Sequence, residues 1–244
     1  MIELQEPNWW QQVPSLDSSM LQVREVETRD TASLYELLTD PRVTEHISSP
    51  PGSLAAFEGF VAWAHREREA GNCVCLAVVP HGLQQAIGIF QVRSLEPTFR
   101  IADWGFAIGA PFWSTGIFQE AAILVADFAF KTIGVHRLEA RAVVDNIRGN
   151  RALEKLGAKG EAALRNAFNR TQKQFLWAIV AEEWSPPKAT ERAVFDAAKL
   201  KRQIARTVEE QLRRTEQERP GSGSASPSPF PFFLTDSSKK PRDR

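Results

Sequence analysis

The fold is decided by residues 106–121, which read FAIGAPFWSTGIFQEA. The apolar start predicts a strand, the middle with Pro111 and Gly116 predicts a tight turn, and the apolar end predicts the beginning of a helix. This order leaves several backbone N–H groups free at the helix N-terminus, where the helix dipole also favours anions. We therefore expect a diphosphate-binding site here, and hence a cofactor.

Hydrophobic periodicity predicts the elements on both sides of this stretch. Strands are expected over residues 20–26, 73–79, 86–92, 100–108, 136–143, 158–168 and 171–180. Helices are expected over residues 29–38, 53–70, 116–132 and 147–156, with Ser53 as one N-cap. The order of elements predicts a single α+β domain over residues 19–185.

The segments outside this domain differ from it in composition. Residues 1–18 show little periodicity and are expected to form an N-terminal arm. Residues 188–219 predict a charged helical extension with a thin apolar stripe, which packs either on the domain or on a second copy in a homodimer. Residues 220–244 begin with a run rich in Gly, Ser and Pro and are expected to be a disordered tail.

The composition excludes several classes of protein. Apolar residues make up 43% of the chain and charged residues 25%, which is typical of soluble globular proteins. Lys plus Arg equals Asp plus Glu at 30 each, so no overall charge favours nucleic acid. No signal peptide, membrane span or spaced Cys/His set for a metal is found, and a cytoplasmic location is expected. Cys73 and Cys75 alternate in a strand and should lie buried on one face.

A diphosphate site at residues 113–118 could hold a mononucleotide, a dinucleotide or coenzyme A. A P-loop is excluded because the turn lacks Gly-Lys-Ser/Thr. A dinucleotide fold would need a glycine triplet near the first strand and an acidic residue about 20 positions later, and neither is evident. Coenzyme A suits the order of elements better.

Five segments resemble, in order and spacing, the motifs of GNAT-superfamily N-acetyltransferases of the RimJ/RimL type. They are residues 40–44 (DPRVT), 103–106 (DWGF), 113–121 (WSTGIFQEA), 134–140 (GVHRLEA) and 146–157 (NIRGNRALEKLG). The resemblance covers residues 20–184. It implies a central mixed, mostly antiparallel sheet flanked by helices, and the transfer of an acetyl group from acetyl-CoA to a primary amine without a metal.

The resemblance also implies how the cofactor is held. Backbone amides of the turn would bind the pyrophosphate, and the preceding strand would pair with the pantetheine arm. The implied cofactor-binding residues are Phe106, Ala107, Ile108, Trp113, Ser114, Thr115, Gly116, Ile117, Phe118, Asn146, Asn150 and Lys155. Two positions depart from the family pattern: Ser114 replaces a glycine and Phe118 replaces a small residue, which would weaken cofactor binding if the ring crowds the phosphates.

The reaction needs a base, because an ammonium group cannot attack a thioester. Asp103 is the candidate catalytic base, with a solvated carboxylate at the strand end as its structural alternative. No conventional general acid is found, since the only tyrosine is Tyr35 and Gly149 stands where relatives have serine. Glu45 and His46 are candidates for contact with the acceptor. Glu120 and His136 are expected to be structural.

The leading hypothesis is an acetyl-CoA-dependent N-acetyltransferase. Its acceptor would be a protein N-terminal amine, as the RimJ/RimL resemblance implies, or a small-molecule amine. The alternative is a degenerate acyl-CoA-binding module that acts through its C-terminal extension, which Phe118 and Gly149 favour. A nucleotide-binding protein remains only if coenzyme A does not bind.

Overall fold

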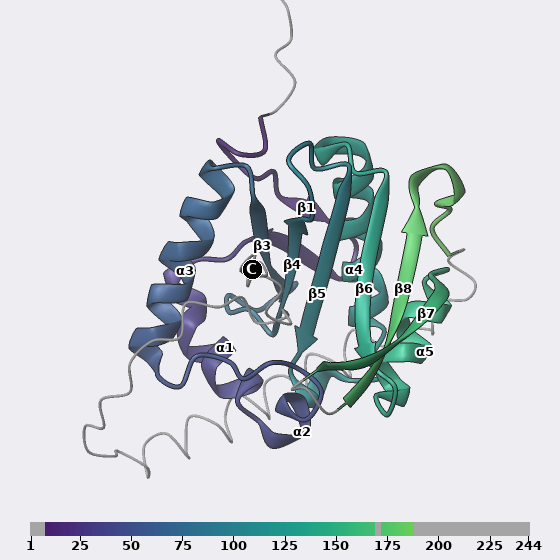
Figure 1. The fold of residues 1–244 in the computed structure, drawn as a ribbon. Coiled ribbons are helices and arrows are strands. Elements are labelled where there is room, and N and C mark those ends of the chain that lie inside the picture. The colour runs from purple at the N-terminus through teal and green to yellow at the C-terminus, as the bar shows by residue number, and fades with distance from the viewer. Residues whose placement is uncertain (1–7, 169–171, 188–244) are drawn as a thin grey trace, which may run out of the picture.

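The computed structural model describes residues 8–168 and 172–187, which are drawn in colour in Figure 1. They form a sheet of eight strands in the order β1-β2-β3-β4-β5-β6-β8-β7. The strands are β1 (Leu16–Asp17), β2 (Leu21–Glu25), β3 (Cys73–Pro80), β4 (Gly88–Ser94), β5 (Ile101–Ile108), β6 (Arg137–Val143), β7 (Lys159–Phe168) and β8 (Gln172–Val180). Neighbours are antiparallel except β5 and β6, which are parallel. The predicted α+β class is confirmed.

The helices lie between the strands as the periodicity predicts. They are α1 (Thr31–Leu38), α2 (Pro41–Thr44), α3 (Leu54–Glu69), α4 (Ile117–Phe128) and α5 (Ile147–Lys155). The predicted cap of α3 is confirmed, because the Ser53 hydroxyl accepts a hydrogen bond from the N–H of Ala56 at 3.2 Å. A π-helical turn, Ala129–Ile133, extends α4 to Gly134, where a left-handed φ of 86° ends it.

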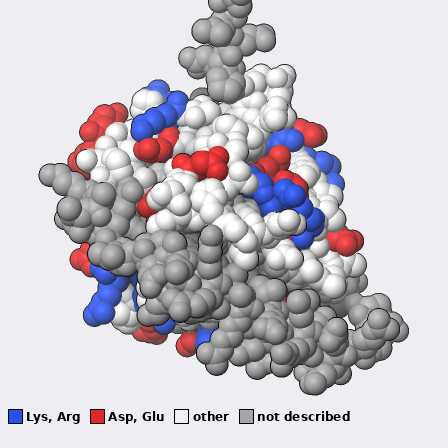
Figure 2. Space-filling model, turned by 180° about the vertical axis from the view of Figure 1, so that it is seen from behind, with Lys and Arg blue, Asp and Glu red and all other residues white. Residues whose placement is uncertain are grey.

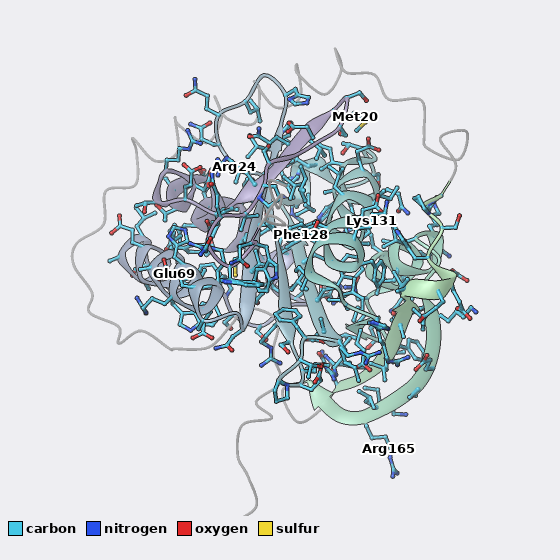
Figure 3. The ribbon with its side chains drawn as sticks, turned by 90° about the horizontal axis from the view of Figure 1, so that it is seen from above. Met20, Arg24, Glu69, Phe128, Lys131 and Arg165 are labelled. Carbon is cyan, nitrogen blue, oxygen red and sulfur yellow. The ribbon has the colours of Figure 1, made fainter. Side chains whose placement is uncertain are left out.

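The two faces of the sheet carry separate apolar cores. Side chains of α1 and α3, with Phe57 at the centre, pack on one face over Cys75 and Ala77. Side chains of α4, with Ile117 among them, pack on the opposite face. Viewed from above, the ends of α3 at Glu69 and of α4 at Phe128 lie on opposite sides of the strands (Figure 3). Alternation of side chains along each strand produces this division.

The two cysteines confirm that alternation. Cys73 and Cys75 are both buried, and their sulfur atoms lie 3.9 Å apart on the face under α3. Burial raises the pKa of the Cys75 thiol well above its usual value. Cys75 is therefore a neutral thiol, and both cysteines are core side chains.

Residues 8–18 of the expected N-terminal arm are part of the domain. Trp9 is only 4% exposed and packs edge-on against Phe99, with ring centroids 5.3 Å apart. Leu16–Asp17 extends the sheet by pairing with β2. Burial of Trp9 and pairing of a short strand fix this segment, although its periodicity is too short to reveal it.

Several predictions concern residues outside the described ranges. They are the turn at residues 169–170, the charged helix at 188–219, through which a homodimer could form, and the tail at 220–244. In the part that the structure describes, no helix is long and apolar enough to cross a membrane. On the described part of the rear face, acidic and basic side chains lie side by side, as the balanced composition suggests (Figure 2).

Candidate functional site

The parallel strands β5 and β6 separate part-way along their length, and the site begins there. They are paired only from Ile101 with Arg137 to Asp103 with Glu139. The N–H of Gly109 donates to the carbonyl of Ile87, the residue before β4. By alternation, the backbone groups of Phe106 and Ile108 therefore point to the other edge of β5. That edge faces the gap left by β6 and can pair with an extended ligand.

The turn after β5 has the backbone geometry that the sequence predicts. Ser114 has a φ of 63° and Gly116 a φ of 87°, both in the left-handed region. The hydroxyl of Thr115 donates to the Phe112 carbonyl at 2.6 Å and closes the turn. Helix α4 then begins at Ile117, and its first N–H groups have no partner inside the helix. A helix start of this kind offers free N–H groups that can bind an anion.

The ring of Phe118 lies against the sheet. Its centroid is 4.6 Å from that of Phe106 and 5.8 Å from that of Phe90. The side chain thereby joins an aromatic cluster that forms one apolar wall of the cleft described below. Packing against β4 and β5 turns the ring into the core, which is the arrangement that leaves the helix start open.

A cleft of about 900 Å³ runs from this turn to α5 and the loop after α2. Nine of the twelve expected cofactor residues line it: Phe106, Ala107, Ile108, Trp113, Ser114, Gly116, Phe118, Asn146 and Lys155. Ile117 is fully buried instead, and Thr115 closes the turn. The backbone of Ala107 faces β4, so only its side chain reaches the cleft.

The side chain of Asn150 makes structural hydrogen bonds within the domain. Its amide nitrogen donates to the carbonyls of Val143 and Asn146, both at 2.9 Å, and its amide oxygen accepts from the indole of Trp177 at 2.8 Å. These bonds fasten α5 to β6 and β8. They occupy the side chain, which lines neither the cleft nor the small cavity described below.

Three cations on α5 face the cleft, and only Lys155 was predicted. Arg148, Arg151 and Lys155 follow one another at helical spacing on one side of α5 and all line the cleft. The guanidinium of Arg148 lies 3.8 Å from the centroid of the Trp113 ring, on the opposite wall. Their i, i+3, i+7 spacing in the sequence could have predicted that these cations share one face of the helix.

Asp103 lies where β5 and β6 part, and the residue is only 5% exposed. Arg141 donates to it at 2.7 Å. Burial raises the pKa of Asp103 to about 6, although Arg141 and Arg93 both act to lower it. The group is therefore ionised at neutral pH, with a proton affinity suited to a base. It is buried, so the alternative of a solvated strand-end carboxylate is wrong.

A small cavity of about 60 Å³, lined by Asp103 among others, lies beside the cleft. The two spaces share a wall, formed by His46, Ile47, Phe106, Asn146 and Gly149. His46 comes from the loop after α2, whereas Gln174 comes from β8. Gln174 and Arg141 line this cavity and were missed, because the sequence does not tell which strand lies beside β6.

The remaining expected residues lie around or away from these spaces. Glu45 is largely exposed and lies 3.8 Å from His46. Glu120 is buried beside the cleft near the start of α4. Tyr35 contacts Gly52 and Phe57 and lines neither space. His136 lies 3.8 Å from Glu182 at the start of β6, where β5 and β6 are still paired.

Comparison with known proteins decides the family. The acetyltransferase (GNAT) domain matches residues 20–159, more than half of the chain. The chain belongs to the GNAT acetyltransferase family. GNAT proteins are acetyl-CoA-dependent N-acetyltransferases, so the predicted activity class is confirmed.

Individual GNAT relatives agree with this assignment. The chain is 25% identical to an uncharacterized N-acetyltransferase, YnaD, of Bacillus subtilis over 70% of this chain and 99% of that protein. It shares its fold with Mycobacterium smegmatis RimJ in complex with CoA-disulfide, at a TM-score of 0.62 and 21% identity over 70% of this chain and 87% of that one. A ribosomal-protein-S5-alanine acetyltransferase of Vibrio fischeri has a TM-score of 0.61 at 18% identity, over 71% of this chain and all of that one.

The residues of the cleft fit coenzyme A. A free strand edge suits the amide-bearing pantetheine arm, the start of α4 suits the pyrophosphate, and the α5 cations suit the phosphate charges. Among the described residues, no group of three or more His, Cys, Asp or Glu side chains is placed to hold a metal ion.

Proposed function

We propose that this GNAT enzyme acetylates the α-amino group of a protein N-terminus. The single observation that carries the proposal is the position of Asp103, in a small cavity beside the cleft at the point where β5 and β6 part. Two structural neighbours, whose names describe ribosomal-protein acetyltransferases, support an N-terminal acceptor over a small amine.

In this proposal the residues of the cleft hold the cofactor. Backbone groups of Phe106 and Ile108 bind the pantetheine arm, and N–H groups at the start of α4 bind the pyrophosphate. When bound, acetyl-CoA supplies the acetyl group as an activated thioester. Arg148, Arg151 and Lys155 neutralise phosphate charge.

Asp103 prepares the acceptor. A free α-amine has a pKa near 8 and is mostly an ammonium group at neutral pH, so it must lose a proton before it attacks. The buried carboxylate, ionised at neutral pH, accepts that proton. Arg141 fixes the carboxylate in place at 2.7 Å. No general acid is assigned, because a thiolate is a good leaving group without one.

Acetyl transfer to synthetic peptides tests this function. Peptides beginning with alanine or serine are incubated with acetyl-CoA, and product is detected by mass spectrometry, with N-terminally acetylated peptides as blank controls. A panel of small primary amines is run in parallel. Transfer to the free peptides supports the proposal. Transfer only to small amines would mean that the acceptor is a small-molecule amine. Acetyl-CoA binding without any transfer would favour an acyl-CoA-binding module instead.

A further inference from the structure

One face of β6 carries three charged side chains in a row. Arg137, Glu139 and Arg141 alternate along the strand with Leu138 and Ala140, which are buried in the same core as α4. Because successive side chains of a strand point to opposite sides, the three charges lie next to one another on the other face. Glu139 lines neither the small cavity nor the cleft, so the site described above leaves it without a role.

Glu139 lies between two arginines. Its Oε1 accepts a hydrogen bond from Nε of Arg137 at 2.8 Å, and its Oε2 lies 3.6 Å from Nη2 of Arg141. The other terminal nitrogen of Arg141, Nη1, donates to Oδ1 of Asp103 at 2.7 Å. The guanidinium of Arg141 therefore lies between two carboxylates, one on each strand of the parallel pair.

The position of Arg141 explains why it needs a second partner. The last paired residues of β5 and β6 are Asp103 and Glu139, so Arg141 comes after the strands have parted. Holding a long side chain in one geometry there costs conformational entropy. Only 14% of the Glu139 side chain is exposed, and Arg137 holds one of its oxygens, so it offers Arg141 an anion at a fixed place. Glu139 thereby helps to keep the guanidinium beside Asp103.

The charges around Asp103 show what the second carboxylate does. Burial and, to a smaller extent, the carboxylate of Glu139 raise the pKa of Asp103, whereas Arg141 on β6 and Arg93 on β4 lower it. His46, in the loop after α2, lines the same cavity. A carboxylate paired with an arginine is a weak base, because the cation favours its charged form. Glu139 offsets part of the charge of Arg141, so Asp103 keeps its affinity for a proton.

We propose that Glu139 is a positioning residue, which shares the guanidinium of Arg141 with Asp103 and thereby keeps Asp103 able to accept a proton. This inference rests on the proposed function and deepens it by naming what controls the base. The step concerned is transfer of one proton from the ammonium group of the acceptor to a carboxylate oxygen of Asp103. Glu139 touches neither reacting atom, so its effect should appear in the pH at which Asp103 titrates.

Variants at Glu139 test this role. Glu139→Gln removes the charge at nearly the same size, whereas Glu139→Asp keeps it. Glu161→Gln is the matched control, because the exposed Glu161 pairs with the terminal nitrogens of Arg137, whereas Glu139 accepts from Nε. The carboxyl carbon of Asp103, in protein made with ¹³C-labelled aspartate and assigned by its loss in Asp103→Asn, is followed by NMR against pH. The pH profile of kcat for a peptide beginning with alanine, the melting temperature and the acetyl-CoA affinity are measured alongside.

In Glu139→Gln, the Asp103 midpoint and the acid limb of kcat should move to lower pH by roughly half to one unit, and kcat at neutral pH should fall about two- to fivefold as the base weakens. Glu139→Asp and Glu161→Gln should titrate close to the wild type. Arg141→Gln should move the midpoint the other way, so a general loss of structure does not explain this result. An Asp103 midpoint that stays in place or rises in Glu139→Gln would overturn the inference.

The double variant separates sharing of Arg141 from a direct effect on Asp103. In the Arg141→Gln background, adding Glu139→Gln should move the midpoint less than it does in the wild type, because no guanidinium is left to share. An equal shift in both backgrounds would overturn the positioning role. The proposed function is judged separately: absence of transfer to the alanine peptide by the wild type would refute it, while the Asp103 titration still decides the role of Glu139.

Discussion

The two ends of the site differ in what they offer a ligand. In the proposed site, the cofactor end uses backbone groups from one continuous stretch, Phe106 to Phe118, together with cations on a single helix. The acceptor end uses buried side chains from a loop and several strands that are distant in sequence. A site built from backbone is encoded locally, whereas a site built from side chains depends on how the sheet is assembled. Four variants, one of them double, test this difference.

Asp103→Ala should have the largest effect, and only at the acceptor end. We expect kcat to fall about 10²- to 10⁴-fold, because the proton acceptor is lost, while acetyl-CoA affinity is retained. Steady-state kinetics and calorimetry measure the two quantities. Glu161→Gln, which removes an exposed carboxylate paired with Arg137, is the control and should leave kcat unchanged. A parallel loss of acetyl-CoA affinity in Asp103→Ala would show that the two ends are not separate.

Arg148→Gln combined with Arg151→Gln should act only at the cofactor end. Removing two cations that line the cleft should weaken acetyl-CoA binding about tenfold at low salt, with a smaller difference at high salt. Calorimetric titration at two ionic strengths measures this. Arg165→Gln is the control, because Arg165 projects away from the body of the domain on β7 (Figure 3). An unchanged affinity in the double variant would exclude these arginines from cofactor binding.

The pH dependence of the rate should report Asp103. Burial raises its pKa to about 6, so kcat should fall below about pH 6 as the carboxylate is protonated. Arg141 favours the charged carboxylate, so Arg141→Gln should raise the pKa further and move the acid limb to higher pH. A pH profile of kcat for both proteins checks the direction. An acid limb that does not move would mean that another group is titrating.

Ser114→Gly should have the smallest effect. Ser114 has a left-handed φ of 63°, which glycine adopts without strain, so the variant should gain about 0.5–1 kcal/mol of stability, or about 1–4 °C in Tm. The same change at Ser33, inside α1, should lower Tm. Thermal melts compare them. Destabilisation by Ser114→Gly would mean that the serine side chain supports the turn.

The cofactor end was largely predictable from the sequence for a local reason. Residues 106–121 contain a strand, a turn with residues in left-handed conformations and an apolar helix start. The geometry of these elements follows from neighbouring residues. The exceptions were long-range: packing against Phe90 on β4 decides where the Phe118 ring lies, and contacts with Trp177 on β8 give Asn150 its structural role.

The acceptor end was predictable only in part. Asp103 and His46 could be named from their segments, but burial of Asp103 depends on how the sheet and the loop after α2 assemble around it. Gln174 could not be found, because β8 is inserted between β6 and β7 and this order is not visible in the periodicity. The prediction for the N-terminal segment was wrong for a similar reason, because Trp9 is held by its contact with Phe99, which is far away in the chain.

Calorimetric titration with acetyl-CoA, with ATP as the control, tests the central claim most directly. A free strand edge, an open helix start and the α5 cations predict binding of acetyl-CoA with a Kd near micromolar, about −8 kcal/mol, and much weaker binding of ATP, which has no pantetheine arm to pair with Phe106 and Ile108. Absence of acetyl-CoA binding, or binding no stronger than that of ATP, would contradict the account.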